Sequence, residues 1–142
     1  MLRVVLDTNI VVSSVLSRSG PPARVMDAWR EIKFILLMSP AILAEVRATL
    51  DYPRIRDKYA ITAQNINELC QLFERHTLWV SGEMPVSGLR LADPKDEMFL
   101  ICAVEGEADF VVSGDRHLLE LGEFAGIAIV TARQFLQRLE AD

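Results

Sequence analysis

The sequence has few cysteines, and their spacing indicates neither a disulfide framework nor a zinc site. Cys70 and Cys102 are the two cysteines among 142 residues, and neither belongs to a CxxC pair. Isolated cysteines of this kind are typical of small, buried, apolar side chains. A disulfide scaffold and a cysteine-rich zinc site therefore have no support in the sequence.

Long hydrophobic runs are also absent. No apolar stretch approaches the roughly 18 residues that span a membrane. The strand-like residues 2–6 open the sequence without a basic segment followed by an apolar core, as a secretory leader would require. We therefore expect a cytoplasmic protein that makes no use of a membrane.

The sequence has fewer basic than acidic residues. Lysines and arginines number 15 against 20 aspartates and glutamates, which gives a net charge of −5. Bulk positive charge cannot hold a nucleic acid under these conditions, so any nucleic acid must be contacted locally. With 51% hydrophobic and 25% charged residues, the chain is predicted to fold as a single compact domain over residues 1–142.

Several familiar catalytic motifs are missing as well. The sequence has no GxGxxG or Walker motif for a nucleotide and no GxSxG nucleophile elbow. An aspartyl nucleophile of the haloacid-dehalogenase kind would require a second aspartate two residues after Asp7, where this chain has Asn9. The sequence therefore gives no support to nucleotide binding through a glycine-rich loop or to these nucleophilic enzymes.

Short apolar runs alternate along the chain with segments of helical period. Alternation of this kind predicts an α/β fold in which a mainly parallel, roughly five-stranded sheet is covered by helices on both faces, a three-layer α/β/α sandwich. Ser39, Asp93 and Thr131 are expected to cap helices. The predicted strands cover residues 2–6, 34–38, 78–80, 110–113 and 127–130, and the predicted helices cover 9–16, 23–32, 41–50, 62–76, 95–107 and 132–139.

Two aspartates follow predicted strands directly. Asp7 ends the run VVLD, and Asp115 comes just after VVSG. Ligands of a parallel sheet collect outside the carboxyl ends of its strands, so both residues are candidate site residues. Each has a simpler interpretation, since Asp7 could cap the following helix and Asp115 could be a turn residue.

Two more acids lie on or beside apolar helix faces. Asp96 falls within about 60° of Phe99, Leu100 and Ala103, at roughly 100° per residue, which directs it toward the buried stripe. Glu45 lies at the border of the apolar arc of its helix. The alternatives are that Asp96 only interacts with the first turn of its helix and that Glu45 is a solvated flank.

Taken together, the four acids predict a metal site. Clustered carboxylates raise one another's pKa unless a cation neutralises them, and a site with only oxygen ligands suits Mg²⁺ or Mn²⁺. Such ions activate water and stabilise charge on a phosphodiester. Phosphodiester hydrolysis is the expected chemistry.

The sequence resembles the PIN-domain nucleases, and among them the VapC-like toxins of toxin–antitoxin pairs. The resemblance rests on MLRVVLDTNIVVSSVLS, SPAILAEVRATL and LADPKDEMFLICAVEGEADFVVSGDRHLLEL. It implies a small α/β/α domain, RNA cleavage that depends on Mg²⁺ or Mn²⁺, a homodimer, and inhibition by a cognate antitoxin. The implied catalytic and metal-binding acids are Asp7, Glu45, Asp96 and Asp115, with Thr8, Asn9 and Ser113 as neighbours that orient ligands or water.

One turn departs from the family pattern. Relatives often have an acid two residues after the position of Asp115, in a GDxDLL-like turn, whereas this chain has His117. His117 could ligate a metal, approach the scissile phosphate, or be an exposed turn residue, and one or two metal ions remain compatible with the turn. Other possible contacts to the RNA backbone are Arg18, Arg24, Arg47 and Arg116, which could equally be solvated charges.

Two other functions use the same motifs. A PIN-like binding module could keep the fold without a working metal site, and a PIN nuclease could act on structured DNA or in ribosomal RNA maturation. Retention of the four acids favours the enzyme. For the expected dimer, Val25, Met26 and Trp29 could form an exposed apolar face, or they could be core residues.

Overall fold

A computed structural model describes residues 1–91 and 93–141 and contains six strands. The strands are short apolar runs, and in the first of them Val4, Val5 and Leu6 are all buried, as expected for a strand covered on both faces. The bounds of the strands are β1 Arg3–Leu6, β2 Ile35–Met38, β3 Leu78–Trp79, β4 Phe110–Val112, β5 Glu123–Phe124 and β6 Ile127–Val130.

The six strands form one sheet in the order β3-β2-β1-β4-β6-β5. Every pairing is parallel except that of β5 with β6. In the centre, Leu6 of β1 is opposite Val112 of β4, and Val112 is opposite Val130 of β6. The carboxyl ends of these three strands therefore lie at one edge of the sheet.

Side-chain caps fix the starts of most helices. Asp7, Ser39, Thr62, Asp115 and Thr131 each accept a hydrogen bond from a backbone N–H of the first turn. The helices are α1 Thr8–Leu16, α2 Pro21–Arg30, α3 Pro40–Leu50, α4 Pro53–Lys58, α5 Ala63–His76, α6 Glu97–Glu105, α7 Arg116–Leu121 and α8 Ala132–Glu140, with 3₁₀ turns η1 Leu89–Leu91 and η2 Pro94–Asp96.

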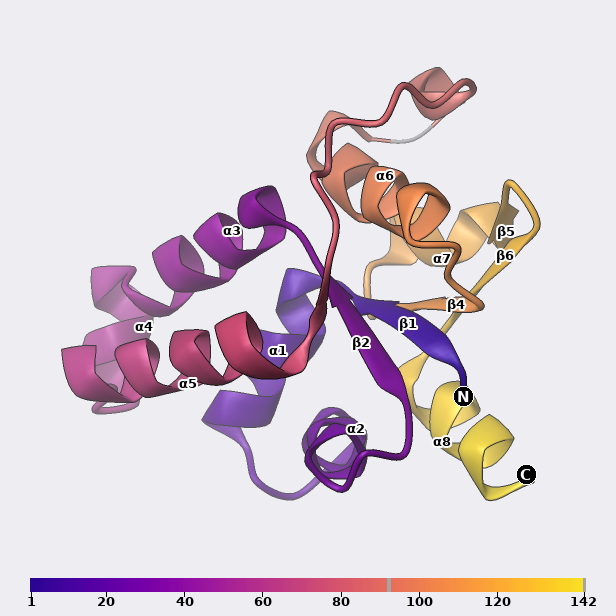
Figure 1. Cartoon of the computed structure of the whole chain (residues 1–142). Helices are drawn as coiled ribbons and strands as arrows, with labels where there is room; N and C mark the ends of the chain where they lie inside the picture. Colours follow the sequence, from indigo (N-terminus) through magenta and orange to yellow (C-terminus); the bar gives the residue numbers. More distant parts are fainter. Residues whose placement is uncertain (92, 142) are drawn as a thin grey trace.

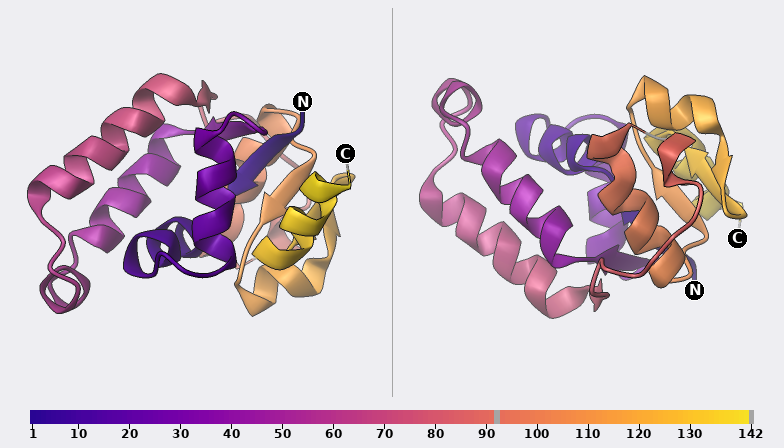
Figure 2. Two further views of the ribbon diagram at one scale, coloured as in Figure 1. Left: turned by 90° about the horizontal axis from the view of Figure 1, so that it is seen from below. Right: turned by 90° about the horizontal axis from the view of Figure 1, so that it is seen from above.

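Helices cover both faces of the sheet, which confirms the predicted α/β architecture. Figure 2 shows α2 and α8 in front of the sheet from below and α6 in front of it from above. Helices α3, α4 and α5 form an arm beside the edge that ends in β3 (Figure 1). The core between the layers includes Phe34, Phe73 and Phe135, each at most 2% exposed.

Two α-helices and one strand were not predicted from the sequence. Helix α4 buries no residue, so it has no apolar periodicity to reveal it. Helix α7 has only six residues, and β5 has two, which pair antiparallel with β6 at the edge of the sheet. The sheet therefore has six strands rather than about five.

Predicted ends of two helices were also wrong, including a start at Pro21 instead of residue 23 for α2 and an end at Glu105 instead of residue 107 for α6. Helix α2 ends at Arg30 instead of residue 32, because Ile32 adopts a φ of 59° and turns the chain toward β2. The helix predicted from residue 95 begins as the 3₁₀ turn η2 and becomes α-helical at Glu97. Asp96 is therefore at the junction of two helical forms.

The apolar residues of α2 belong to the core. Val25, Met26 and Trp29 are 0%, 1% and 6% exposed, so they do not form an exposed dimer face. In the described part of the chain, no helix is long and apolar enough to cross a membrane.

Candidate active site

The strand order brings residues far apart in the sequence to one edge of the sheet. Because β1 and β4 are neighbours, the backbone N–H of Asp7 donates to the carbonyl of Val112 at 3.0 Å. The N–H of Ser113 in turn donates to the carbonyl of Val130, at 2.9 Å. The ends of three parallel strands thus place Asp7 and Ser113 beside the start of α8.

Asp7 both caps α1 and contributes a buried carboxylate to this edge. It is 3% exposed, and its Oδ1 accepts from the N–H of Ile10 at 3.0 Å, which is the capping bond. Its Oδ2 accepts a hydrogen bond from the hydroxyl of Ser113. Burial raises the pKa of Asp7, and the charge of Asp115 raises it further, against the lowering effect of the bonds from Ser113 and Ile10.

The hydroxyl of Ser113 connects the two aspartates that follow strands. Ser113 is fully buried, donates to Asp7, and accepts from the backbone N–H of Asp115 at 2.8 Å. Asp115 is half-buried, and its Oδ1 accepts from the N–H of His117 at 2.7 Å as the cap of α7. Ser113 therefore fixes Asp115 relative to Asp7.

Asp96 has the least satisfied carboxylate of the site. It is 4% exposed, and its Oδ2 has no hydrogen-bond partner among the described residues. Desolvation, followed by the charges of Asp115, Asp93 and Asp7, raises the pKa of Asp96 to about 6, although Lys95 opposes the shift. A buried carboxylate oxygen without a partner is costly and suits a cation.

Glu45 is joined to α1 through a threonine. The hydroxyl of Thr8 donates to Oε2 of Glu45 at 2.6 Å, and Glu45 is half-buried on α3. Thr8 directly follows Asp7, so this bond ties Glu45 to the same edge of the sheet. Asn9, the third polar residue of the sequence DTN, is exposed.

The donor set fits a hard divalent cation held partly by water. Asp7, Asp96 and Asp115 offer only oxygen, and Mg²⁺ is usually bound by one or two carboxylates together with waters. Within residues 1–91 and 93–141, no group of three or more aspartate, glutamate, histidine or cysteine side chains is arranged so that it could hold a metal ion. The unpartnered Oδ2 of Asp96 is the atom that a cation would satisfy.

The residues predicted to contact RNA lie in different places. Arg116 is exposed and pairs with Glu120 at 3.0 Å, and Arg47 donates to Asn67 at 2.8 Å. The side chain of His117 is exposed.

The other two predicted contacts, Arg18 and Arg24, line two separate hollows. The second hollow also contains Arg133, which the sequence analysis missed because an isolated arginine on an exposed helix face gives no signal.

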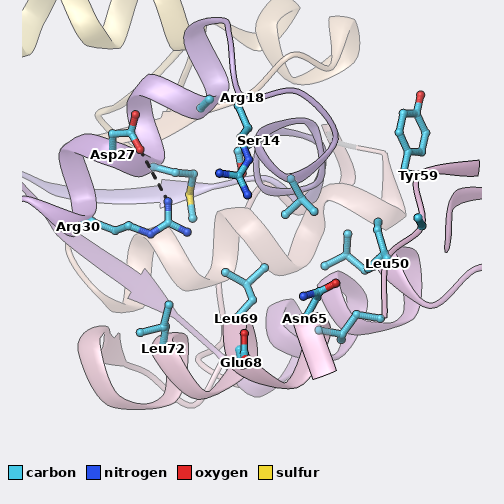
Figure 3. A pocket seen from close by; sticks show the side chains of 16 residues that line it. Ser14, Arg18, Asp27, Arg30, Leu50, Tyr59, Asn65, Glu68, Leu69 and Leu72 are labelled. Carbon is cyan, nitrogen blue, oxygen red and sulfur yellow. Dashed lines mark ion pairs between the residues drawn. The ribbon is translucent and has the colours of Figure 1, made fainter. Parts of the chain in front are cut away.

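The first hollow is a groove of about 730 Å³ between α1 and α2 on one side and α5 with the end of α3 on the other. Figure 3 shows Leu69, Leu72 and Tyr59 along it, together with Arg18 and the ion pair of Asp27 and Arg30. Leu72 and Tyr59 are 38% and 43% exposed. The groove is therefore amphipathic and open to solvent.

The match to known proteins identifies the family. Residues 3–117 match the PIN domain, so the chain belongs to the PIN-domain family, as the sequence motifs predicted. Proteins of this family are generally nucleases and typically depend on a metal. The chain is also 28% identical over 120 residues to the uncharacterized protein MJ1680 of Methanocaldococcus jannaschii, across 84% of this chain and 75% of that protein.

Two solved structures share the fold. VapBC2 from Rickettsia felis, crystallised with a DNA fragment from its promoter, superposes with a TM-score of 0.60 at 13% identity, over 90% of this chain and 97% of that one. FitAcB from Neisseria gonorrhoeae gives a TM-score of 0.54 at 16% identity, over 92% and 98%. The chain is thus similar in fold to a chain in each of these two structures.

Proposed function

We propose that this protein is a metal-dependent ribonuclease that acts in the cytoplasm as the toxin of a toxin–antitoxin pair. The observation that supports it most strongly is the carboxylate of Asp96, buried beside Asp7 and Asp115 with one oxygen unpartnered. A protein that only needed a stable fold would gain by replacing this group. Membership of a family of nucleases gives the carboxylates a chemical use.

In this proposal Asp7, Asp96 and Asp115 hold one Mg²⁺ or Mn²⁺, directly or through water, and a second ion is compatible with the turn at His117. When bound, such an ion lowers the pKa of a water and neutralises charge on the phosphoryl oxygens. Glu45, whose Oε1 is not used by Thr8, binds the ion or orients the attacking water.

The remaining residues of the site keep this arrangement rigid. Ser113 orients Asp7 and positions the backbone of Asp115, and Thr8 orients Glu45. Attack of water at phosphorus with the 3′ oxygen leaving gives 5′-phosphate ends and has no chemical need for the 2′-hydroxyl. Preference for RNA must therefore come from binding, most readily to single-stranded or looped segments whose bases are open to contact.

The amphipathic groove supports a protein partner. It begins at Ser14, which is seven residues after Asp7, or about 10 Å along α1 at 1.5 Å per residue. An amphipathic helix of an antitoxin could bury its apolar side against Leu72 and Tyr59 (Figure 3). A basic side chain that follows this helix could then reach the carboxylates.

A cleavage assay tests the enzyme. Purified protein is incubated with end-labelled single-stranded RNA and matched DNA in Mg²⁺, Mn²⁺ or EDTA, beside Asp7→Asn and Asp96→Asn. We expect cleavage of RNA that requires metal, gives 5′-phosphate ends and is lost in both variants. Asp57→Asn, an exposed aspartate on α4, is the matched control and should cleave normally.

The same assay separates the alternatives. Cleavage of DNA in preference to RNA would reassign the substrate. Inactivity on varied RNAs, together with no metal binding by calorimetry, would indicate a binding module that retains the fold without the chemistry.

The partner and the dimer need separate experiments. Coexpression with a basic antitoxin should abolish cleavage, and Leu72→Asp in the groove should restore it. Unchanged cleavage in the presence of that protein would contradict inhibition through this groove. Light scattering of the purified protein at micromolar concentration tests the proposed homodimer.

A further inference from the structure

The second hollow lies between α2 and α8, outside the carboxylate site. It has a volume of about 490 Å³, and Figure 2 shows the two helices side by side on one face of the sheet. Its polar lining consists mainly of Arg24 from the first turn of α2, Arg133 from the first turn of α8, and Gln137 one turn further along α8. Glu140 lies in the lining as well, at the last residue of α8.

Neither arginine of the hollow has a side-chain partner in the described part of the chain. Both are exposed, and neither makes a hydrogen bond or an ion pair with the residues that the structure describes. By contrast, Arg30 on the same helix as Arg24 pairs with Asp27, and Arg116 pairs with Glu120. Two unpaired guanidinium groups on one concave surface are a recognition surface for an anion.

A short stretch of backbone joins the carboxylate site to the hollow. The carbonyl of Val130 accepts from the N–H of Ser113, whose hydroxyl donates to Asp7. Thr131 then caps α8, and Arg133 follows in its first turn. Arg133 therefore lies only three residues from a backbone atom that is bonded to the carboxylate site.

We propose that the α2–α8 cleft binds the phosphodiester backbone of single-stranded RNA, with Arg24 and Arg133 as the phosphate contacts. This inference rests on the proposed ribonuclease function, since it names the path of the substrate beyond the cleavage site. A chain with net charge −5 and buried carboxylates at its active site repels a polyanion. The unpaired arginines of the cleft offset this repulsion locally, and Gln137 adds an amide that can donate to phosphate or ribose.

The first test measures binding without cleavage. Fluorescence anisotropy of a labelled single-stranded RNA is recorded in EDTA over a range of salt concentrations. We expect Arg24→Ala/Arg133→Ala to weaken binding about tenfold and to make the dependence of log K on log[salt] shallower by about 1.4, since each lost phosphate contact removes roughly 0.7. Arg24→Lys/Arg133→Lys retains both charges and should keep most of the salt dependence.

A charge-matched control separates a local contact from net charge. Arg54→Ala/Arg75→Ala removes two exposed arginines, one from α4 and one from α5, on the arm of the molecule. This control should bind RNA within twofold of the wild type. Equal losses of RNA affinity in the two double variants would show that only the net charge of the protein matters, and would overturn the proposal.

Steady-state cleavage in Mg²⁺ gives the second readout. The cleft variant should raise KM about tenfold and leave kcat within twofold, because the arginines are remote from the reacting phosphate. If the wild type cleaved RNA and the cleft variant had the same KM, the RNA-binding role of the cleft would be refuted. The proposed ribonuclease function would still stand. Failure of the wild type to bind or cleave RNA would refute both the RNA-binding role of the cleft and the proposed ribonuclease function. If a polyglutamate peptide instead bound with the same dependence on the arginines while RNA binding did not change, the cleft would be a site for an acidic protein.

Discussion

Replacing Asp96 by asparagine is expected to stabilise the metal-free protein at neutral pH. The carboxylate of Asp96 is 4% exposed, lacks a partner at Oδ2, and faces the negative charges of Asp115, Asp93 and Asp7. Asparagine has almost the same shape and no charge, so it removes the electrostatic penalty without leaving a cavity. A residue retained at a cost to stability is typical of a functional site.

The size and sign of the effect follow from the pKa. Asp96 titrates near 6 in the folded protein and has an ordinary value of 3.8. Because the folded-state pKa is the higher one, stability falls as pH rises from about 4 to about 6, and the penalty is complete above that range. At about 1.4 kcal/mol per pH unit the penalty has an upper bound of roughly 3 kcal/mol. Solvent screening at the edge of the sheet reduces it to about 1–2 kcal/mol.

Thermal and urea unfolding in EDTA measure this difference. Asp96→Asn should raise the melting temperature by about 3–8 °C at pH 7.5, and the gain should shrink toward zero near pH 4. Added Mg²⁺ should stabilise the wild type by mass action and leave Asp96→Asn nearly unchanged. The control Asp57→Asn should differ from the wild type by less than about 0.5 kcal/mol at either pH.

The reasoning would be refuted by a destabilised Asp96→Asn at pH 7.5, or by a gain that persists unchanged at pH 4. Either result would mean that Asp96 is stabilised by its surroundings as a carboxylate. An equal response of the wild type and Asp96→Asn to Mg²⁺ would separately exclude Asp96 as a metal ligand.

Two further substitutions test the support around the site, and a third tests the packing of the end of α6 against β2. Ser113→Ala should lower metal affinity by about 10- to 100-fold in calorimetry, because the hydroxyl that orients two aspartates is lost; unchanged affinity would mean that the hydroxyl has no such role. Thr8→Val should reduce kcat more than KM, since Glu45 loses the donor that orients it, and equal kcat values would contradict that role. Gly106→Ala should cost about 1–3 kcal/mol in urea unfolding, because its Cβ would lie 2.7 Å from Cδ1 of Leu37, and a variant as stable as the wild type would show that this leucine can move.

The local sequence determined the main elements and the candidate acids. The apolar run before Asp7 and the pairs Ser39-Pro40 and Asp93-Pro94 predicted strands and helix starts that the structure contains, because burial on both faces and capping are properties of neighbouring residues. The motifs around Asp7 and Asp115 were specific enough to predict the PIN-domain family, which the match over residues 3–117 confirms. Short elements without a buried face, such as α4, gave no such signal.

Only the tertiary structure decided how these residues meet. The order β1-β4-β6 joins Asp7 to Ser113 and Ser113 to Val130, and no local pattern specifies which strands become neighbours. The same packing gave Asp7 two roles, as a helix cap and as a ligand candidate, which the sequence had presented as alternatives. It also placed Arg133 beside Arg24 in one cleft, since contacts between α2 and α8 arise from long-range packing rather than from residue spacing.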